Sequence, residues 1–262
     1  MNNRLVLVIC MIFSLSLACN LVYAPVPTAT IAVPPSGTPV PASTATAMAT
    51  ETPLPTATLT PTLEPPSITE QFLSDVRVVS HDSFYNTGNW NLWDPKTGSI
   101  ADHVLELQGT SSWSSGLVFN QKFQGGSGIV LKFKLQNANA KSQFVFDAGQ
   151  WQTDAFRQFG IYNGKTPQAD LVQGQQDLGG KYLHGNLSLQ TDTWYNILMA
   201  IDPNARLLAV MWDPSDESRL SVFDQDFSQN WAGQNWDFVV QANAGETVYV
   251  SDFYQISFGT MK

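Results

Sequence analysis

The segment WYNILMAIDPNARLLAVMWD, residues 194–213, carries the clearest structural pattern in the chain. Its alternating apolar residues are Ile197, Met199 and Ile201 in the first half, and Leu208, Val210 and Trp212 in the second. Alternation with a period of two is typical of strands that bury one face. The turn formers of residues 202–205 stand between the two halves. The segment therefore predicts an antiparallel β-hairpin.

The same alternation recurs through the C-terminal two thirds of the chain. Further strands are predicted at residues 129–135 (IVLKFKL), 143–147 (QFVFD) and 247–258. Turn formers separate them, among them Gly125-Gly126 and Gly179-Gly180. Ten or more strands at this spacing, with no convincing helix, predict an all-β antiparallel sandwich over residues 68–262.

Several of these segments resemble concanavalin A-like jelly-roll domains. The resemblance is carried by HDSF at residues 81–84, GNW at 88–90, the predicted hairpin, and YVSDFY at 249–254. It covers roughly residues 76–259. It implies a jelly-roll β-sandwich with one concave face, in which the last strand returns beside the first. The family includes lectins, laminin-G-like domains, sugar-binding modules and endoglucanases, so the resemblance leaves the function open.

Composition narrows the function classes. The chain has 262 residues, and its 13 Lys and Arg against 22 Asp and Glu give a net charge of −9. Binding to a phosphate backbone needs clustered cations, so nucleic acid is excluded as the main partner. Charged residues are only 13% of the chain, so the surface is built largely from uncharged polar residues. The sequence gives no signal for a particular oligomeric state.

The N-terminal residues 1–19, MNNRLVLVICMIFSLSLAC, have the layout of a secretory signal peptide. A cation, Arg4, precedes an apolar run that is too short to span a bilayer. The run ends at Ala18-Cys19, which resembles a bacterial lipoprotein processing site, although Ser16 stands where such sites prefer Leu. We expect Cys19 to be lipidated and to anchor the protein on the outer side of a membrane.

Two alternatives to the lipoprotein remain open. Cleavage after Ala24 would leave Pro25 just past the cut, which signal peptidases tolerate poorly. An uncleaved anchor from Leu5 to Ala24 is long enough, but polar residues interrupt it.

Residues 20–67 form a segment rich in Pro, Thr and Ala. Eleven of the 15 prolines lie between Pro25 and Pro66, and no apolar periodicity is present. Such a composition predicts a disordered, semi-rigid linker that would hold the folded domain away from the membrane. We therefore expect an extracytoplasmic protein at the cell surface.

The residues for glycoside hydrolysis are missing from the pattern. Glucanases of the concanavalin A-like family place Glu-x-Asp-x-x-Glu on one strand, which brings two carboxylates to the same face. The folded region has four glutamates, and none begins that motif. Asp224 and Asp226 share one face of a short strand and are the nearest substitute for a carboxylate pair. We predict that the protein is not an enzyme.

Metal ligands are equally sparse. The three histidines are far apart in the sequence and show no metal-ligand spacing. Asp82 and Asp252 approach each other if the first and last strands pair, and calcium prefers such oxygen ligands. We predict no cofactor apart from this candidate structural calcium ion.

The tryptophans offer the best candidate for a binding site. We expect Trp90, Trp194 and Trp212 to lie in the core, because they stand in or near predicted strands. The tryptophans in polar surroundings are Trp113 in SSWSS, Trp151 in GQWQT, and Trp231 and Trp236 in QNWAGQNWD. The apolar face of a pyranose stacks on such rings while amides bond its hydroxyls, as bases stack on aromatic side chains.

We predict a carbohydrate-binding site formed by Trp113, Trp151 and Trp231, with Asp147 and Arg157 on the same face of a hairpin. The predicted function is a surface-anchored, non-catalytic carbohydrate-binding lipoprotein whose partner is a carbohydrate or cell-wall glycan. Two alternatives remain: a structural or protein-adhesion module on the same fold, and an unconventional glycoside hydrolase.

Overall fold

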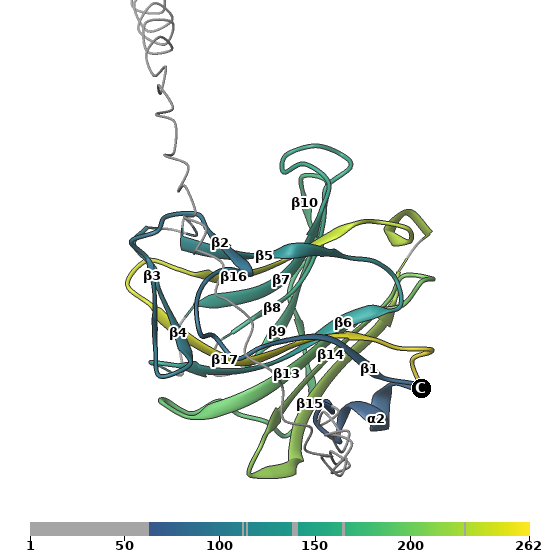
Figure 1. Ribbon diagram of the computed structural model, residues 1–262. Coiled ribbons are helices and arrows are strands. Elements are labelled where there is room, and N and C mark those ends of the chain that lie inside the picture. Colours follow the sequence, from purple (N-terminus) through teal and green to yellow (C-terminus); the bar gives the residue numbers. More distant parts are fainter. Residues whose placement is uncertain (1–62, 112, 114, 138–140, 164–165, 228) are drawn as a thin grey trace, which may run out of the picture. The chain divides into compact units, whose positions relative to one another are not determined.

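The predicted hairpin lies in the interior of the larger of two antiparallel sheets that stack as layers (Figure 1). The structure is a computed structural model that describes residues 63–111, 113, 115–137, 141–163, 166–227 and 229–262. Cys19, the predicted signal peptide and residues 20–62 of the predicted linker lie outside the described residues. The two halves of the hairpin pair from Asn196 opposite Trp212 to Ile201 opposite Leu207. The hairpin prediction is confirmed.

The larger sheet has nine strands. In spatial order they are β12 (His184–Gly185), β15 (Asp216–Asp226), β14 (Arg206–Asp213), β13 (Trp194–Ile201), β6 (Ser127–Leu135), β17 (Thr247–Ser257), β4 (Val104–Gln108) and β3 (Gly98–Ala101), with β1 (Arg77–Asp82) paired to β17.

The smaller sheet has eight strands. In spatial order they are β10 (Gln176–Asp177), β9 (Gln168–Gln173), β8 (Arg157–Tyr162), β7 (Ser142–Ala148), β16 (Trp236–Ala242), β5 (Ser115–Phe123) and β2 (Trp90–Leu92), with β11 (Lys181–Tyr182) paired to β9. The described residues also form two short helices, the α-helix α2 (Thr69–Phe72) and the 3-10 helix η1 (Gln229–Trp231). No helix among the described residues is long and apolar enough to cross a membrane.

Strand β17 joins the beginning of the domain to its end. Its first half pairs with β4, and its second half pairs with β1, where His81 lies opposite Tyr254. The change of partner falls at an irregularity between Ser251 and Tyr254, where Asp252 has a φ of 47°. The last long strand therefore lies beside the first, as the resemblance to jelly-roll domains implies.

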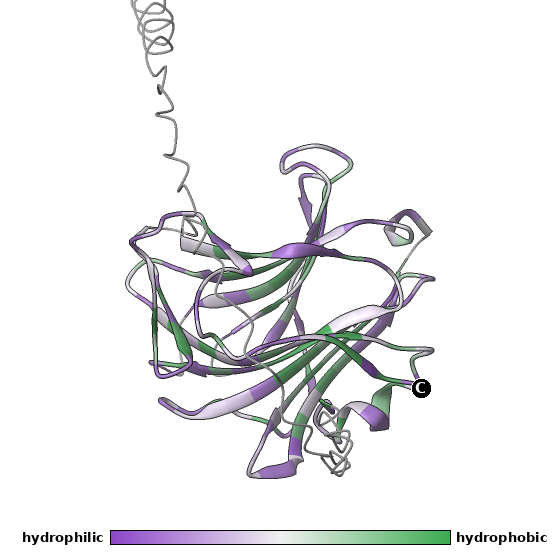
Figure 2. Cartoon of the chain, in the orientation of Figure 1, coloured by the Kyte–Doolittle hydropathy of each residue, from purple (hydrophilic) through white to green (hydrophobic). Residues whose placement is uncertain are grey.

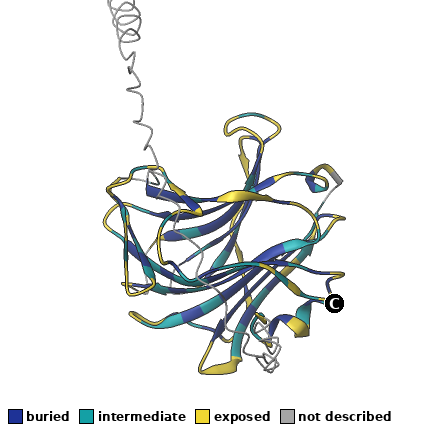
Figure 3. Cartoon of the chain, viewed as in Figure 1, coloured by how far each residue is buried: buried dark blue, intermediate teal, exposed yellow. Residues whose placement is uncertain are grey.

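The interior between the sheets contains many aromatic rings among aliphatic side chains. Figure 2 shows hydrophobic residues, and Figure 3 shows buried residues, along the strands of both sheets. Trp90 from the smaller sheet contacts Phe253 from the larger one, with ring centroids 4.8 Å apart. Phe119 packs on both rings, at 5.0 Å and 4.6 Å. Burying aromatic side chains of this size is the largest single contribution to such a core. Trp90 is a core residue, as predicted.

The larger sheet is apolar on its outer side as well, so both faces of β14 are buried and Trp212 is buried as predicted. Because Ile197 pairs with Met211, the inward residues of β14 are Leu207, Ala209 and Met211. Leu208, Val210 and Trp212 lie on the outer side and are buried there in a second apolar cluster. Trp194 points outward too and is only partly buried, so the prediction that it lies in the core is wrong.

The two ends of the domain cover this outer cluster. Ile68 from the start of the domain and Met261 near its end both pack in the cluster. The segments also bond to each other, with the amide of Ser74 donating to the carbonyl of Thr260 over 2.9 Å. The strand pair β13 and β14 is therefore buried on both faces. Because the residues of both faces are apolar, periodicity alone does not show which of the two alternating sets of residues points between the sheets.

Asp82, at the end of β1, forms hydrogen bonds with the segment that leads from β1 of the larger sheet to β2 of the smaller sheet. Its carboxylate accepts hydrogen bonds from the amide of Phe84 (2.7 Å), from Nδ2 of Asn89 (3.1 Å) and from Nε1 of Trp90 (2.9 Å). Phe84 and Trp90 are both buried, so the amide of Phe84 and the indole N–H of Trp90 have no access to bulk water.

We predict that Asp82→Ala lowers the free energy of unfolding by about 2–4 kcal/mol, because it leaves buried N–H donors without an acceptor. Urea denaturation followed by tryptophan fluorescence measures the change. Asp94→Ala is the matched control, because Asp94 also accepts an amide hydrogen bond, from Lys96, but at an exposed site. An equal loss of unfolding free energy in the two variants would contradict the importance of the buried N–H groups that donate to Asp82.

Candidate functional site

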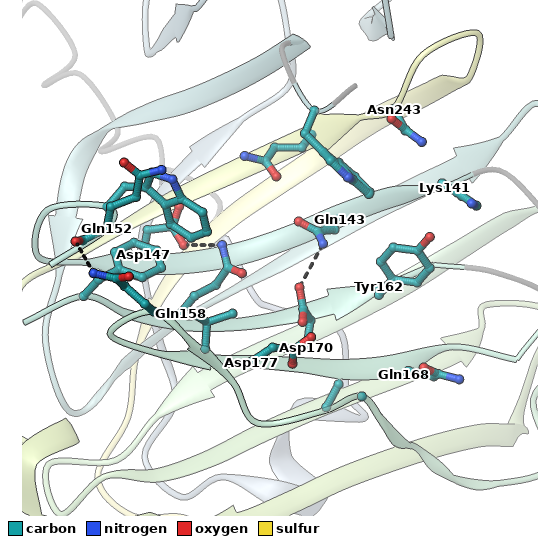
Figure 4. A pocket seen from close by; sticks show the side chains of 18 of the residues that line it. Lys141, Gln143, Asp147, Gln152, Gln158, Tyr162, Gln168, Asp170, Asp177 and Asn243 are labelled. Carbon is teal, nitrogen blue, oxygen red and sulfur yellow. Dashed lines mark hydrogen bonds between the residues drawn. The ribbon is translucent and has the colours of Figure 1, made fainter. Parts of the chain in front are cut away.

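A groove of about 1440 Å³ lies on the outer side of the smaller sheet, over strands β7, β8, β9 and β16 (Figure 4). Its polar lining residues are Lys141, Gln143, Asp147, Gln152, Gln158, Tyr162, Gln168, Asp170, Gln175, Asp177, Gln241 and Asn243. Most of the side chains are amides or carboxylates, and the aromatic lining residues come mainly from loops at the two ends of the strands.

The polar floor follows from strand alternation. In β7 the buried Phe144 and Phe146 point into the core, so Gln143 and Asp147 point outward into the groove. In β8 the buried Phe159 likewise leaves the neighbouring Gln158 on the groove side, where Figure 4 shows it beside Asp147. The alternation in residues 143–147 was visible in the sequence, but the amides of the other strands were not predicted as site residues.

Trp151 stands at one end of the groove and is 59% exposed. It belongs to the loop between β7 and β8, which is tightly bonded: the amide of Thr153 donates to Gln150, and that of Phe156 to Thr153. The ring of Phe156 meets the edge of Trp151 with centroids 4.8 Å apart. The loop therefore holds an exposed indole in place beside the groove.

Trp113 also lines the groove, near the opposite end of the strands. Its ring lies 5.8 Å from that of Tyr162, at the far end of β8. Trp113 is partly buried and has a φ of 52°, a backbone conformation that few residues other than glycine adopt. The predicted candidates Trp113, Trp151 and Asp147 are therefore brought together on one surface.

Trp93 is a groove residue that sequence reasoning missed. It is 47% exposed and follows β2 directly. Its ring lies over Gly116, where an added Cβ would come within 2.5 Å of the indole. The polar residues around it (Asn91, Asp94) are the same signal that singled out the other loop tryptophans, so the pattern was present.

Trp231 does not line the groove, and its predicted exposure is wrong. It is 1% exposed, and it packs on Phe227 at 4.6 Å and Trp236 at 6.1 Å between ring centroids. Its Nε1 donates to Oε1 of Gln173 over 3.1 Å. Because that hydrogen bond satisfies the indole, the loop folds over and buries the ring in the core.

Arg157 is not on the groove side either, which corrects the expectation that it shares a face with Asp147. Arg157 lies opposite Ala148, the neighbour of Asp147, so the two side chains point to different sides of the sheet. Arg157 is buried, and Nη1 donates to the carbonyls of Asp154 and Phe156, both over 2.7 Å.

The actual partner of Asp147 is Gln158, whose Nε2 donates to Oδ1 over 2.8 Å. Burial raises the pKa of Asp147 to about 7; this hydrogen bond opposes the rise, and the carboxylates of Asp237 and Asp170 add to it. Asp237 lies directly opposite Asp147 on β16 and is paired with Lys122 at 2.5 Å.

Asp170, on β9, is the second carboxylate of the groove floor. Nε2 of Gln143 donates to its Oδ2 over 2.8 Å (Figure 4). Burial raises the pKa of Asp170, and the nearby carboxylate of Asp177 raises it further. Both floor carboxylates therefore lie where negative charge is disfavoured.

The structure adds no further metal ligand to the two candidate calcium ligands, Asp82 and Asp252, among the described residues. Asp82 already accepts three hydrogen bonds, and Asp252 Oδ1 lies 3.9 Å from Nε2 of His81. Within the described residues, no group of three or more His, Cys, Asp or Glu side chains is placed to hold a metal ion. Calcium at Asp82 and Asp252 stays a prediction.

No protein-family model matches the sequence, and no curated protein matches it. The structure is similar to an endo-β-1,3-glucanase from Pyrococcus furiosus, with a TM-score of 0.53, 10% identity, and coverage of 71% of this chain and 95% of the glucanase. It is also similar to SCLam, a non-specific endo-β-1,3(4)-glucanase of family GH16, with a TM-score of 0.52, 10% identity, and coverage of 72% and 93%.

Lectin II from Ulex europaeus is more distant, with a TM-score of 0.47, 11% identity, and coverage of 65% of this chain and 94% of the lectin. The likeness to the two glucanases shows that the fold of the chain is a jelly-roll β-sandwich of the concanavalin A-like type, as the sequence resemblance implies. At these identities the likeness is one of fold.

We predict that Asp147→Asn stabilises the protein at alkaline pH and changes its stability little at acidic pH. Because folding raises the pKa of Asp147 from 3.8 to about 7, the folded state binds this proton more tightly than the unfolded state. The stability that the proton contributes is full below about pH 4 and is lost as the pH rises toward 7. Asparagine does not ionise and so avoids the loss.

Calorimetric melting at about pH 3.5 and about pH 8 checks this, with a rise in midpoint of about 3 °C or more expected only at the higher pH. Asp102→Asn, at an exposed turn, is the control. A gain of the same size at both pH values would contradict the burial of an ionisable Asp147.

Proposed function

We propose that the chain is a non-catalytic carbohydrate-binding protein whose groove over the smaller sheet holds a glycan. In this proposal lipid on Cys19 anchors it at the cell surface, and residues 20–67 are the stalk that carries the domain outward. The observation that carries the proposal is the convergence of three partly exposed tryptophans, Trp93, Trp113 and Trp151, on one amide-rich groove.

Aromatic rings and amides suit sugars for separate physical reasons. The C–H face of a pyranose is apolar and stacks on indole, which removes exposed aromatic surface from water. The hydroxyls that ring the sugar both donate and accept, and each of Gln143, Gln158, Gln168 and Gln241 can do the same. A hydrophobic ligand would cover the remaining donors and acceptors of these amides without bonding to them, which costs free energy.

The length of the groove favours a chain over a single sugar. Along β7, Gln143 and Asp147 are four residues apart, which is roughly 13 Å in a strand. Trp151 lies beyond the Asp147 end, and Trp113 lies beside Tyr162, which is opposite Gln143. The tryptophans therefore bound a span longer than one pyranose ring, and we infer that several units of an oligosaccharide or polysaccharide occupy it.

The comparisons support this proposal at the level of the fold. The two glucanases named above act on β-glucans according to their names, and this chain shares their fold. The lipid anchor and the surface location rest on the sequence around Cys19 and on the composition of the linker.

We predict that Trp151→Ala and Trp93→Ala each weaken glycan binding about tenfold or more, because each removes a stacking platform. Affinity electrophoresis on gels containing β-glucans, xylan, chitin derivatives or cell-wall polysaccharide measures the loss for any glycan that retards the protein. Trp113→Ala is expected to act in the same direction.

Tyr85→Ala is the matched control, because Tyr85 is 79% exposed and lies outside the groove lining. If no glycan in the panel retards the protein, or if Tyr85→Ala weakens binding as much as the tryptophan variants, the proposed site is wrong.

One arrangement favours a second candidate function, glycoside hydrolysis. Asp147 and Asp237 lie directly opposite each other on neighbouring strands, and such pairs have Cβ atoms about 5 Å apart. Retaining glycosidases use two carboxyl groups at about this separation. Against this, Asp237 is ion-paired with Lys122 and is not part of the groove lining. The other carboxylates considered, Asp224 and Asp226, lie on β15 of the larger sheet, where Asp224 is bound by Arg206.

We therefore expect no release of reducing sugar from the polysaccharides that the protein binds, measured over long incubations. The control is the same assay on Asp147→Asn and Asp237→Asn. Turnover by the unaltered protein that both substitutions abolish would establish the hydrolase and overturn the non-catalytic proposal.

A further inference from the structure

The charge of the groove is one-sided. Its described lining residues include three aspartates, Asp147, Asp170 and Asp177, and one cation, Lys141. Lys141 lies next to the Gln143 end of β7, so the Asp147 end of the same strand has no cation among these lining residues. A ligand in the groove therefore meets a surface of hydrogen-bond acceptors with excess negative charge.

The two floor carboxylates have no cationic partner among the described residues. The ion pairs of the described chain use other aspartates, namely Asp192, Asp213, Asp224, Asp237 and Asp252. Asp147 and Asp170 each receive a side-chain hydrogen bond from one neutral amide. A buried or half-buried carboxylate is normally satisfied by a cation or by several donors, so these two retain acceptor capacity toward the groove.

The raised pKa values of Asp147 and Asp170 have the same physical origin. Burial disfavours their negative charge, and neighbouring carboxylates disfavour it further; a positive charge placed in the groove opposes both effects. A hydroxyl group supplies a hydrogen bond and no net charge. A cationic group on the ligand supplies hydrogen bonds and also offsets the excess negative charge.

The aromatic platforms suit a cation as well. Trp151 belongs to the loop that follows β7, and it is four residues from Asp147 in the sequence. Both side chains line the groove. An ammonium group next to an indole face is attracted by the ring quadrupole, in addition to its attraction to a carboxylate. An acidic sugar, by contrast, is repelled by the three aspartates.

We propose that the groove binds a glycan with free amino groups, a chain of de-N-acetylated amino sugars, whose ammonium groups lie against Asp147 and Asp170 while its rings stack on the tryptophans. This inference rests on the proposed function and names the class of glycan for the same groove. It excludes uronate-rich and sulfated chains as ligands.

A pair of oligosaccharides tests the inference directly. A β-1,4-linked glucosamine hexamer and its fully N-acetylated counterpart have the same rings and the same linkage, and they differ only in charge. We expect titration calorimetry of the full-length chain near pH 7, where Asp147 is partly ionised and the amines are partly protonated, to give at least about tenfold tighter binding of the glucosamine hexamer. Raising the salt concentration should narrow this difference, because the interaction is with partly exposed charges.

Two isosteric variants assign the effect to the floor carboxylates. Asp170→Asn and Asp147→Asn are expected to weaken binding of the glucosamine hexamer about fivefold or more and to leave binding of the N-acetylated hexamer unchanged. Asp226→Asn is the matched control, because it changes the net charge equally at an exposed position on the larger sheet. Thermal melting of each variant confirms that it is folded.

The outcomes separate this inference from the proposed function. Equal affinity for the two hexamers, or binding only of a neutral glycan from the panel, overturns the amino-sugar inference and leaves carbohydrate binding in place. The same holds if Asp226→Asn weakens binding as much as Asp170→Asn. Failure of every glycan to bind overturns both.

Discussion

The packing of aromatic side chains between the two sheets sets the position of every polar side chain on the groove. Phe144, Phe146 and Phe159 are buried against the larger sheet, and strand geometry then sends their neighbours to the opposite side. A slip of one residue in β7 would expose two phenylalanines and bury Gln143 and Asp147. Burial of these phenylalanines therefore fixes the strand register of the smaller sheet, and this register determines which side chains form the groove floor.

The floor itself is unfavourable to the fold. Asp147 is ionised only above an unusually high pKa, and its neighbour across the sheet, Asp237, carries a further carboxylate. A carboxylate in such a place is typical of a site whose charge has a use, since an amide there would be neutral at every pH. The exposed rings of Trp93 and Trp151 support the same interpretation. An exposed indole lacks the stabilisation that burial gives to the other tryptophans, so its exposure is typical of a binding surface. Charge and aromatic surface are retained side by side on one face.

The sequence predicted much of this and failed in definable places. Trp151 and Trp231 stand in equally polar stretches, yet one is exposed and the other buried, because only Trp231 meets Phe227, Trp236 and the acceptor on Gln173. Gln173 is far away along the chain, and the proximity of Phe227 and Trp236 in the sequence does not show that the loop folds inward. The alternation in β14 did not show which face lies between the sheets, because both of its faces are apolar and both are buried. Arg157 failed by one residue of register, since its neighbour Gln158 is the side chain that meets Asp147.

The sequence alone determined the class of fold, the central hairpin and the presence of loop tryptophans, because these follow from short-range periodicity and turn chemistry. Composition also distinguished an apolar N-terminal stretch and a proline-rich segment from the region with strand periodicity. Tertiary structure decided which rings are exposed, which carboxylates face one another and where a groove lies. These properties depend on the pairing of strands that are far apart in the chain, and pairing across a sheet is a property of three dimensions that no local pattern contains.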